Sequence, residues 1–179
     1  NVTGDSIDEG HVATISMGVG DPGTLDVFTV NVDWRDGSTA TIGSLGATDA
    51  TGTIGATNYS WTAATRQLTL THLYADNANY PVIVRMADDD MAANFGGAAS
   101  DANYVQQTTL ISVANLAPTL AGTSNLAVDE GSAVTLVGLG VHIEDLGFDN
   151  PSNQTPPPLG NLTTEEFVAA SIDWGDGFS

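Results

Sequence analysis

The chain has 179 residues, among which three arginines and no lysine face 22 carboxylates, so its formal net charge is −19. Nucleic acids and anionic membranes bind proteins through Lys and Arg, so this charge excludes both as partners and favours cations. Cysteine is absent, which excludes disulfides, thiolate metal sites and cysteine nucleophiles. No apolar run is long enough to span a membrane as a helix.

Aspartate outnumbers glutamate 17 to 5 in the acidic fraction. Asp suits turns and tight oxygen cages, so we expect the charge in loops and not on helices. The hydrophobic content of 41%, with many Val, Ile and Thr residues, favours a folded β protein over a disordered chain. Two settings fit such a surface. One is an extracellular setting in which calcium takes the place of disulfides, and the other is a high-salt habitat.

Hydrophobic periodicity in the first two thirds of the chain has a repeat of two, which predicts strands with one buried face. Short turn-rich segments separate them, and Asp36-Gly37 predicts a hairpin turn. About seven short strands in this arrangement are typical of an antiparallel β-sandwich. Strands are expected near residues 12–15, 28–34, 39–42, 66–73, 80–86 and 104–113, with long loops at 43–58 and 88–103.

An internal repeat divides the chain. Residues 7–15 (IDEGHVATI) recur as 128–136 (VDEGSAVTL), and residues 31–38 (NVDWRDGS) recur as 171–178 (SIDWGDGF). The segment between these landmarks is longer in the second copy because of a proline-rich insertion at about 145–164, which predicts a surface loop. We therefore expect one complete domain at 1–117 and the N-terminal part of a second at 118–179, joined by an extended segment at Pro118.

Several blocks of the first copy resemble the PKD-type (polycystic kidney disease) Ig-like domains that occur in tandem in bacterial and archaeal surface proteins. The resemblance implies a seven-stranded Ig-like sandwich that serves as a spacer, an adhesive unit or a carbohydrate-contacting module. Arg35, where the second copy has Gly175, and Met91 after the acidic run depart from the pattern. The matching blocks are residues 21–26 (DPGTLD), 28–37 (FTVNVDWRDG), 72–80 (HLYADNANY), 88–90 (DDD) and 115–119 (NLAPT).

The second copy stops at Ser179, before the later strands of the first copy have an equivalent. Half a sandwich exposes an apolar face and open strand edges. Two interpretations follow: the native chain continues, or strands from a neighbouring molecule complete the second copy.

Two groups of carboxylates in the first copy are candidate calcium ligands. Asp33 and Asp36 lie at a strand end and a turn, where capping of turn amides is the competing interpretation. Asp88, Asp89 and Asp90 end a predicted strand, and charges packed so closely require either solvent or a bridging cation.

A third acidic group lies near the expected junction between the copies. It consists of Asp8 and Glu9 and of their repeats, Asp129 and Glu130. Calcium binds about six to eight oxygens, so a shared ion here would stiffen the joint. The competing interpretation is a solvated turn.

The aromatic residues have different expected roles. Trp34 and its repeat Trp174 are interpreted as core anchors, and His72 with Tyr74 as buried structural residues, because no nucleophile is placed beside the histidine. Trp61 lies in a predicted loop segment at 59–61, where an exposed indole is a candidate contact for a sugar or a protein. No residue pattern predicts catalysis.

These observations predict a non-enzymatic structural or adhesive module of a large extracellular or cell-surface repeat protein, stiffened by calcium. Its expected partners are neighbouring Ig-like repeats or copies of itself, together with extracellular polysaccharide. The alternative is an accessory carbohydrate- or protein-binding module of a secreted hydrolase.

Overall fold

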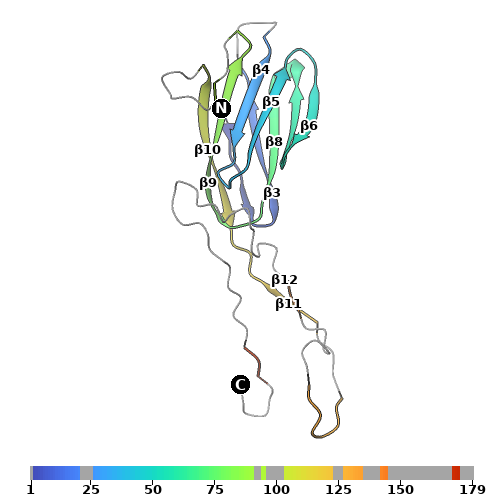
Figure 1. Ribbon diagram of the computed structural model, residues 1–179. Helices are drawn as coiled ribbons and strands as arrows, with labels where there is room; N and C mark the ends of the chain where they lie inside the picture. The colour runs from blue at the N-terminus through green and yellow to red at the C-terminus, as the bar shows by residue number, and fades with distance from the viewer. Residues whose placement is uncertain are drawn as a thin grey trace.

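The computed structural model describes residues 2–20, 26–90, 94–95, 103–122, 127–134, 142–144 and 171–173, which are almost entirely β (Figure 1). One short 3-10 turn, η1 at Ala63–Thr65, interrupts the strands. The strands are β1 Val2–Thr3, β2 Ser6–Asp8, β3 His11–Gly18, β4 Phe28–Asp33, β5 Thr39–Leu45, β6 Ala50–Ile54, β7 Thr57–Thr62, β8 Gln67–Tyr74, β9 Ala78–Asp88, β10 Val105–Ala114, β11 Thr119–Ala121 and β12 His142–Glu144.

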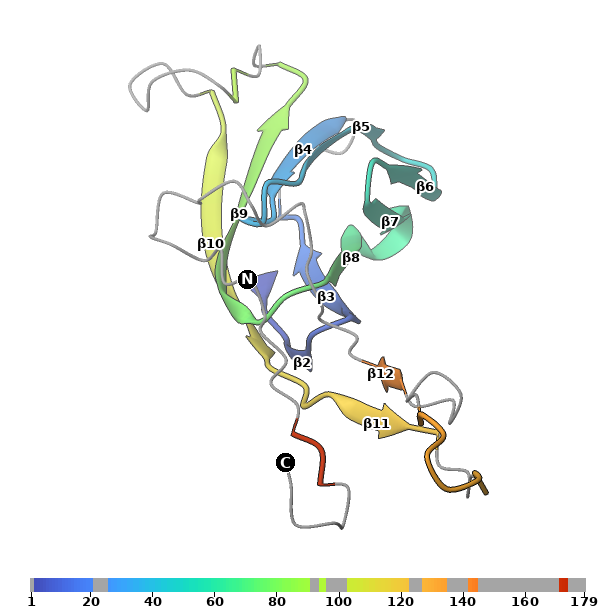
Figure 2. The same ribbon diagram turned by 60° about the horizontal axis from the view of Figure 1, so that its bottom comes forward.

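Two five-stranded sheets face each other and form a β-sandwich (Figure 2). One sheet has the order β1-β3-β8-β7-β6, and the other has the order β2-β10-β9-β4-β5. All pairs in them are antiparallel except β2 with β10, which is parallel. The predicted all-β sandwich is therefore confirmed, and the arrangement is consistent with an Ig-like fold.

Period-two alternation places the core between the sheets. In β4, Phe28, Val30 and Val32 are buried while the residues between them are only partly covered. The same alternation buries one face of β3, β8 and β9, since successive side chains of a strand point to opposite faces. Packing of these inner faces is the main source of stability, because apolar burial drives folding.

The sandwich has more strands than the seven predicted. Two short strands precede the first predicted one, and β1 joins one sheet while β2 joins the other. The predicted loop at 43–58 is also wrong, because β6 and the start of β7 form a hairpin there. Gly55 makes its tight turn with a φ of 59°, the left-handed region that glycine adopts without strain.

The hairpin predicted at Asp36-Gly37 is confirmed, since it joins the paired strands β4 and β5. Gly37 has a φ of 95° in this turn. Arg35 also has a positive φ, 68°, which L residues adopt only at a cost. The equivalent position in the second copy is Gly175, a residue type that adopts such a φ without strain.

Beyond the sandwich, β11 and β12 pair antiparallel with each other in a small separate sheet (Figure 1). The proline-rich insertion at 145–164, together with Trp174 and Asp176, lies outside the described residues. In the described part of the chain, no helix has the length and apolar character needed to cross a bilayer.

Candidate functional site

The end of β4 carries a buried aromatic and ionic cluster. Trp34 follows the strand and is fully buried, which confirms its predicted role as a core anchor. Its indole Nε1–H donates a hydrogen bond of 2.7 Å to Thr57 Oγ1 on β7. Its ring stacks on the imidazole of His72, with centroids 4.7 Å apart. The tryptophan therefore joins the two sheets through both its polar and its apolar atoms.

Asp36 and His72 form a buried hydrogen-bonded pair beside this indole. Asp36 lies in the turn after β4, His72 lies on β8, and Asp36 Oδ2 is 2.7 Å from His72 Nε2. The other imidazole nitrogen, Nδ1, is 3.3 Å from the carbonyl oxygen of Ala56. Both ring nitrogens thus face oxygens that belong to the fold. This geometry suits a structural histidine, as predicted, and not a general base that awaits a substrate.

Burial by itself raises the pKa of the Asp36 carboxyl, because desolvation disfavours the charged form. The hydrogen bond and positive charge of His72 and the amide of Ser38 act in the opposite direction and prevail. The pKa of Asp36 therefore lies below its ordinary value of 3.8. Ser38 N–H donates to Asp36 Oδ1 at 2.8 Å, so this carboxylate also caps the hairpin turn.

Two tyrosines complete the cluster. Tyr74 O–H donates 2.9 Å to the carbonyl of Trp34, and burial followed by the charge of Asp36 raises the pKa of Tyr74, so the phenol stays a donor. Tyr80, near the start of β9, donates to the carbonyl of Asp76 four residues upstream. A tyrosine bonded in this way is the tyrosine corner of Ig-like sandwiches. The two phenol rings stack with centroids 4.3 Å apart.

A second polar site lies where the chain leaves the sandwich. Glu9, in the turn between β2 and β3, has an exposed fraction of 0%. Its Oε1 accepts a hydrogen bond of 2.6 Å from Leu116 N–H, and its own N–H donates to the carbonyl of Ala114. The solvated turn considered for this acidic group is therefore wrong for Glu9, although Asp8 is exposed. The buried carboxylate ties the first turn of the sandwich to the segment that follows its last strand.

The remaining acidic candidates do not come together. Asp33 forms an ion pair of 3.2 Å with Arg35 and also accepts the Arg35 N–H. In the acidic run after β9, Asp88 Oδ1 accepts Asp90 N–H, and Asp89 Oδ1 accepts Val27 N–H. Each of these carboxylates thus accepts a backbone N–H, which is the capping role that the sequence offered as the alternative to calcium for Asp33.

Asp129 and Glu130, the repeats of Asp8 and Glu9, are exposed. Among the residues that the structure describes, no three His, Asp or Glu side chains gather in a group that could hold a metal ion.

Trp61 is not the exposed loop residue that the sequence predicted. It lies in β7, and only 2% of its surface is exposed. Its Nε1–H donates to the carbonyl of Gly46, and its ring packs edge-on against Phe28. Trp61 nonetheless helps to line a cavity of about 350 Å³ at one end of the sandwich, together with Asp26, Asp49 and Arg66.

The substitution Asp36→Asn is expected to lower the free energy of unfolding at pH 7 by about 1.5–3 kcal/mol, because a neutral amide replaces the charged acceptor of a buried hydrogen bond. The pKa of Asp36 is lower in the folded chain, so its stabilisation is complete above 3.8 and disappears as the pH falls through the folded-state value. The difference in the free energy of unfolding between wild type and Asp36→Asn should therefore be smaller at pH 3 than at pH 7. Urea unfolding followed by tryptophan fluorescence at pH 7 and pH 3 measures both effects.

Asp8→Asn, at an exposed position, serves as the control and should change stability by less than about 0.5 kcal/mol at either pH. A difference between Asp36→Asn and wild type that is the same at both pH values would contradict the assignment of the charge effect to Asp36.

The resemblance to PKD-type domains depends on the sequence blocks alone. No protein-family model matches the chain, and no curated protein is significantly similar to it. The geometry of the sandwich and its two buried polar sites therefore carries the functional interpretation.

Proposed function

We propose that this chain is a non-enzymatic structural module of an extracellular or cell-surface repeat protein, and that its role is to hold neighbouring PKD-type, Ig-like repeats at a fixed separation and direction. Its partners are then the adjoining repeats and further copies of the same chain. The proposal gives the polypeptide a mechanical role and assigns no substrate to it.

The observation that supports this function most strongly is the contact of Glu9 with Leu116. A spacer must control the direction in which the chain leaves each domain. Here a buried carboxylate accepts the backbone N–H of Leu116, the second residue beyond β10 and two residues before Pro118. A hydrogen bond to a charged acceptor is stronger than one between neutral groups, and the proline restricts the next residues further.

The repeat supports the same proposal. Glu9 and Glu130 occupy the same place in the two DEG sequences, and the glycines that follow them have similar backbone angles, with φ of 72° at Gly10 and 82° at Gly131. Two copies of the same structural element are expected to share the conformation of this turn.

Glu9→Ala is expected to loosen the exit segment, because Leu116 N–H loses its acceptor. Hydrogen exchange of the Leu116 amide should accelerate by about tenfold or more. This factor follows from the loss of a hydrogen bond to a charged group, which contributes about 1.5–3 kcal/mol. X-ray scattering of the full chain should show a broader distribution of maximum dimensions.

Glu9→Gln is the matched control, since its amide oxygen still accepts a hydrogen bond, and its effect should be smaller. Unchanged exchange at Leu116 in Glu9→Ala would show that the carboxylate does not hold the exit segment, and the spacer proposal would then lose its main support.

Calcium stiffening belongs to the same proposal. The side chains of Asp8, Asp89, Asp90, Asp129 and Glu130 face solvent, and a formal charge of −19 raises the local concentration of divalent cations. Extracellular modules bind calcium with dissociation constants of about 10⁻⁴–10⁻³ M, so occupancy is expected at millimolar calcium.

Millimolar CaCl₂ should raise the melting temperature and narrow the distribution of dimensions in scattering, relative to protein in EDTA. MgCl₂ at equal ionic strength separates specific binding from general screening, because magnesium retains its water and fits flexible carboxylate sites poorly. Equal melting temperatures in calcium, magnesium and EDTA would refute calcium stiffening and leave the spacer role intact.

The cavity beside Trp61 favours a second candidate function, an accessory carbohydrate-binding module of a secreted hydrolase. Its volume of about 350 Å³ is within the range of small-ligand sites, about 300–1,000 Å³. Asp26, Asp49 and Arg66 supply the acceptors and donors that sugar hydroxyls need. The guanidinium carbon of Arg66 also lies 5.9 Å from the centre of the Phe28 ring.

A glycan array compares the two functions directly. Specific glycan binding that Arg66→Gln weakens by about tenfold or more would favour the accessory module, because the variant loses a charged donor at the cavity. Glu9→Gln, which lies at a different part of the sandwich, is the control. The structural function predicts no binding that depends on Arg66.

A further inference from the structure

One edge of the sandwich is only half covered. Strand β2 pairs with β10 at Ser112, Val113 and Ala114, and the chain reaches β2 through Gly4, which lies against the carbonyl of Leu110. In the described part of the chain, no strand pairs with this edge of β10 between Val105 and Thr109. Figure 2 shows the short strand β2 near one end of β10, with which it pairs at Ser112–Ala114.

Backbone groups along the open stretch point away from the sheet. Ser112 N–H donates outward to the carbonyl of Asp5, and Ala114 accepts from Glu9 on the same side. Peptide groups alternate in direction along a strand, so Gln106 and Thr108 also direct their N–H and C=O outward. They are arranged to receive another strand.

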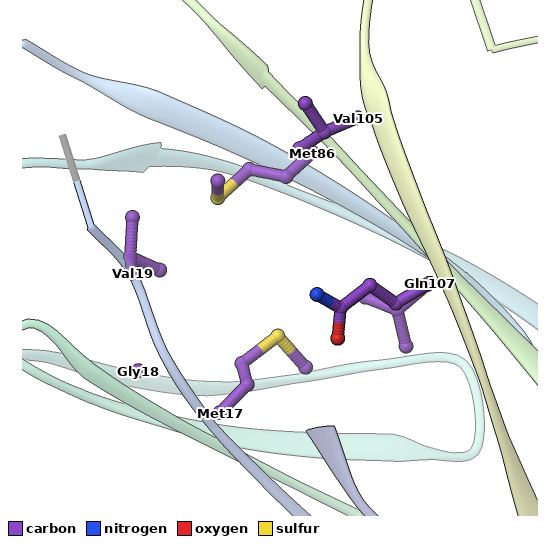
Figure 3. A pocket seen from close by; sticks show the side chains of 7 residues that line it. Met17, Gly18, Val19, Met86, Val105 and Gln107 are labelled. Carbon is purple, nitrogen blue, oxygen red and sulfur yellow. The ribbon is translucent and has the colours of Figure 1, made fainter. Parts of the chain in front are cut away.

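The inner face beside this edge is also open. Figure 3 shows the side chains of Met17, Met86 and Gln107 converging from β3, β9 and β10 on a small apolar groove. The groove has a volume of about 70 Å³, and Val105 at its rim is 63% exposed. At the opposite edge of the same sheet, the inner-face side chains of β5, namely Ala40, Ile42 and Leu45, are at most 3% exposed. Of these two strands, therefore, only β10 leaves its inner-face side chains exposed near the edge.

We propose that a second copy of this chain covers the groove by antiparallel pairing of β10 with β10 across a twofold axis at Gln107. This register places Gln106 opposite Thr108 of the other copy, so that the outward backbone groups of both residues bond with each other. It also places Val105 opposite Thr109 of the other copy, with both side chains on the inner face of the sheet.

Charge favours this occupant and this location. No Asp, Glu, Lys, Arg or His occurs between Asp101 and Asp129. Two molecules with a net charge of −19 each repel each other, so they associate most easily where the meeting strands are uncharged. The strand VQQTT is also compatible with itself, because its Gln and Thr side chains donate and accept hydrogen bonds.

The contact is short, since Gly4 at Leu110 limits it to five residues in each copy. Its area is below that of a standard interface, about 1,200–2,000 Å², so a single contact is weak. Sedimentation velocity of the full chain at concentrations up to about 1 mM is therefore required, in low and in high salt. Salt should strengthen the dimer, because it screens the repulsion between the two acidic molecules.

Thr108→Pro removes an outward N–H and keeps the bonds of β10 to β9, which the alternate residues make. Proline is tolerated at such an edge position. The dissociation constant should rise by about tenfold or more, because each dimer loses two hydrogen bonds. Circular dichroism and the melting temperature establish that the variant is folded. Thr108→Glu should act in the same direction, whereas Thr41→Glu on β5 should not.

Single cysteines test the register in a chain that has none of its own. Under mild oxidation Gln107→Cys should form a disulfide-linked dimer, since non-bonded antiparallel partners have Cα atoms about 4.5 Å apart. Leu110→Cys, three residues from the axis, is the matched control and should remain largely uncrosslinked.

A monomer at every concentration and salt level would overturn the proposal. A dimer that Thr108→Pro leaves unchanged would also overturn it, as would equal crosslinking of the two cysteine variants. All of these results are independent of the spacer role, which depends on Glu9.

Discussion

The contact between Asp36 and His72 is the constraint around which the sandwich is organised. The aspartate belongs to the turn after β4 in one sheet, and the histidine belongs to β8 in the other, so the pair connects the sheets without a covalent bond. The indole of Trp34 covers the pair, and Tyr74 bonds to the backbone of the same turn. Many Ig-like sandwiches join their two sheets by a disulfide that packs against a tryptophan. In this chain, which has no cysteine, the hydrogen-bonded Asp36–His72 pair joins the sheets and packs against Trp34.

Part of the acidic composition has a local explanation. Carboxylates of Asp5, Asp33, Asp36, Asp49 and Asp89 each accept a backbone N–H, mostly at turns and strand ends. A short side chain reaches such an amide without extra rotatable bonds, so Asp serves better than Glu. Part of the negative charge is therefore a consequence of capping many turns in an all-β chain, and cation binding need not account for all of it.

Regular alternation made most of the first copy predictable from sequence. Strands such as β4 and β9 alternate between buried apolar side chains and less buried ones. The dipeptide Asp36-Gly37 is typical of a hairpin turn. The β6–β7 hairpin was not predictable in the same way, because Ala, Gly and Thr give it little apolar contrast, and Trp61 was placed in a loop for that reason. Glu9 could not be recognised as buried, since its partner Leu116 lies at the other end of the domain sequence. The pairing of Asp36 with His72 likewise depends on the tertiary arrangement.

The parallel pairing of β2 with β10 determines how the sandwich responds to tension. Force applied through the two ends of the domain pulls the start of β2 and the end of β10 in opposite directions along their common axis. The hydrogen bonds between them are then loaded in shear, all together, and not opened one after another as in an unzipping hairpin. Glu9 adds its bond to Leu116 at the point where the load enters β10. A sandwich connected in this way resists extension at its termini, where a filament or a tether would transmit force.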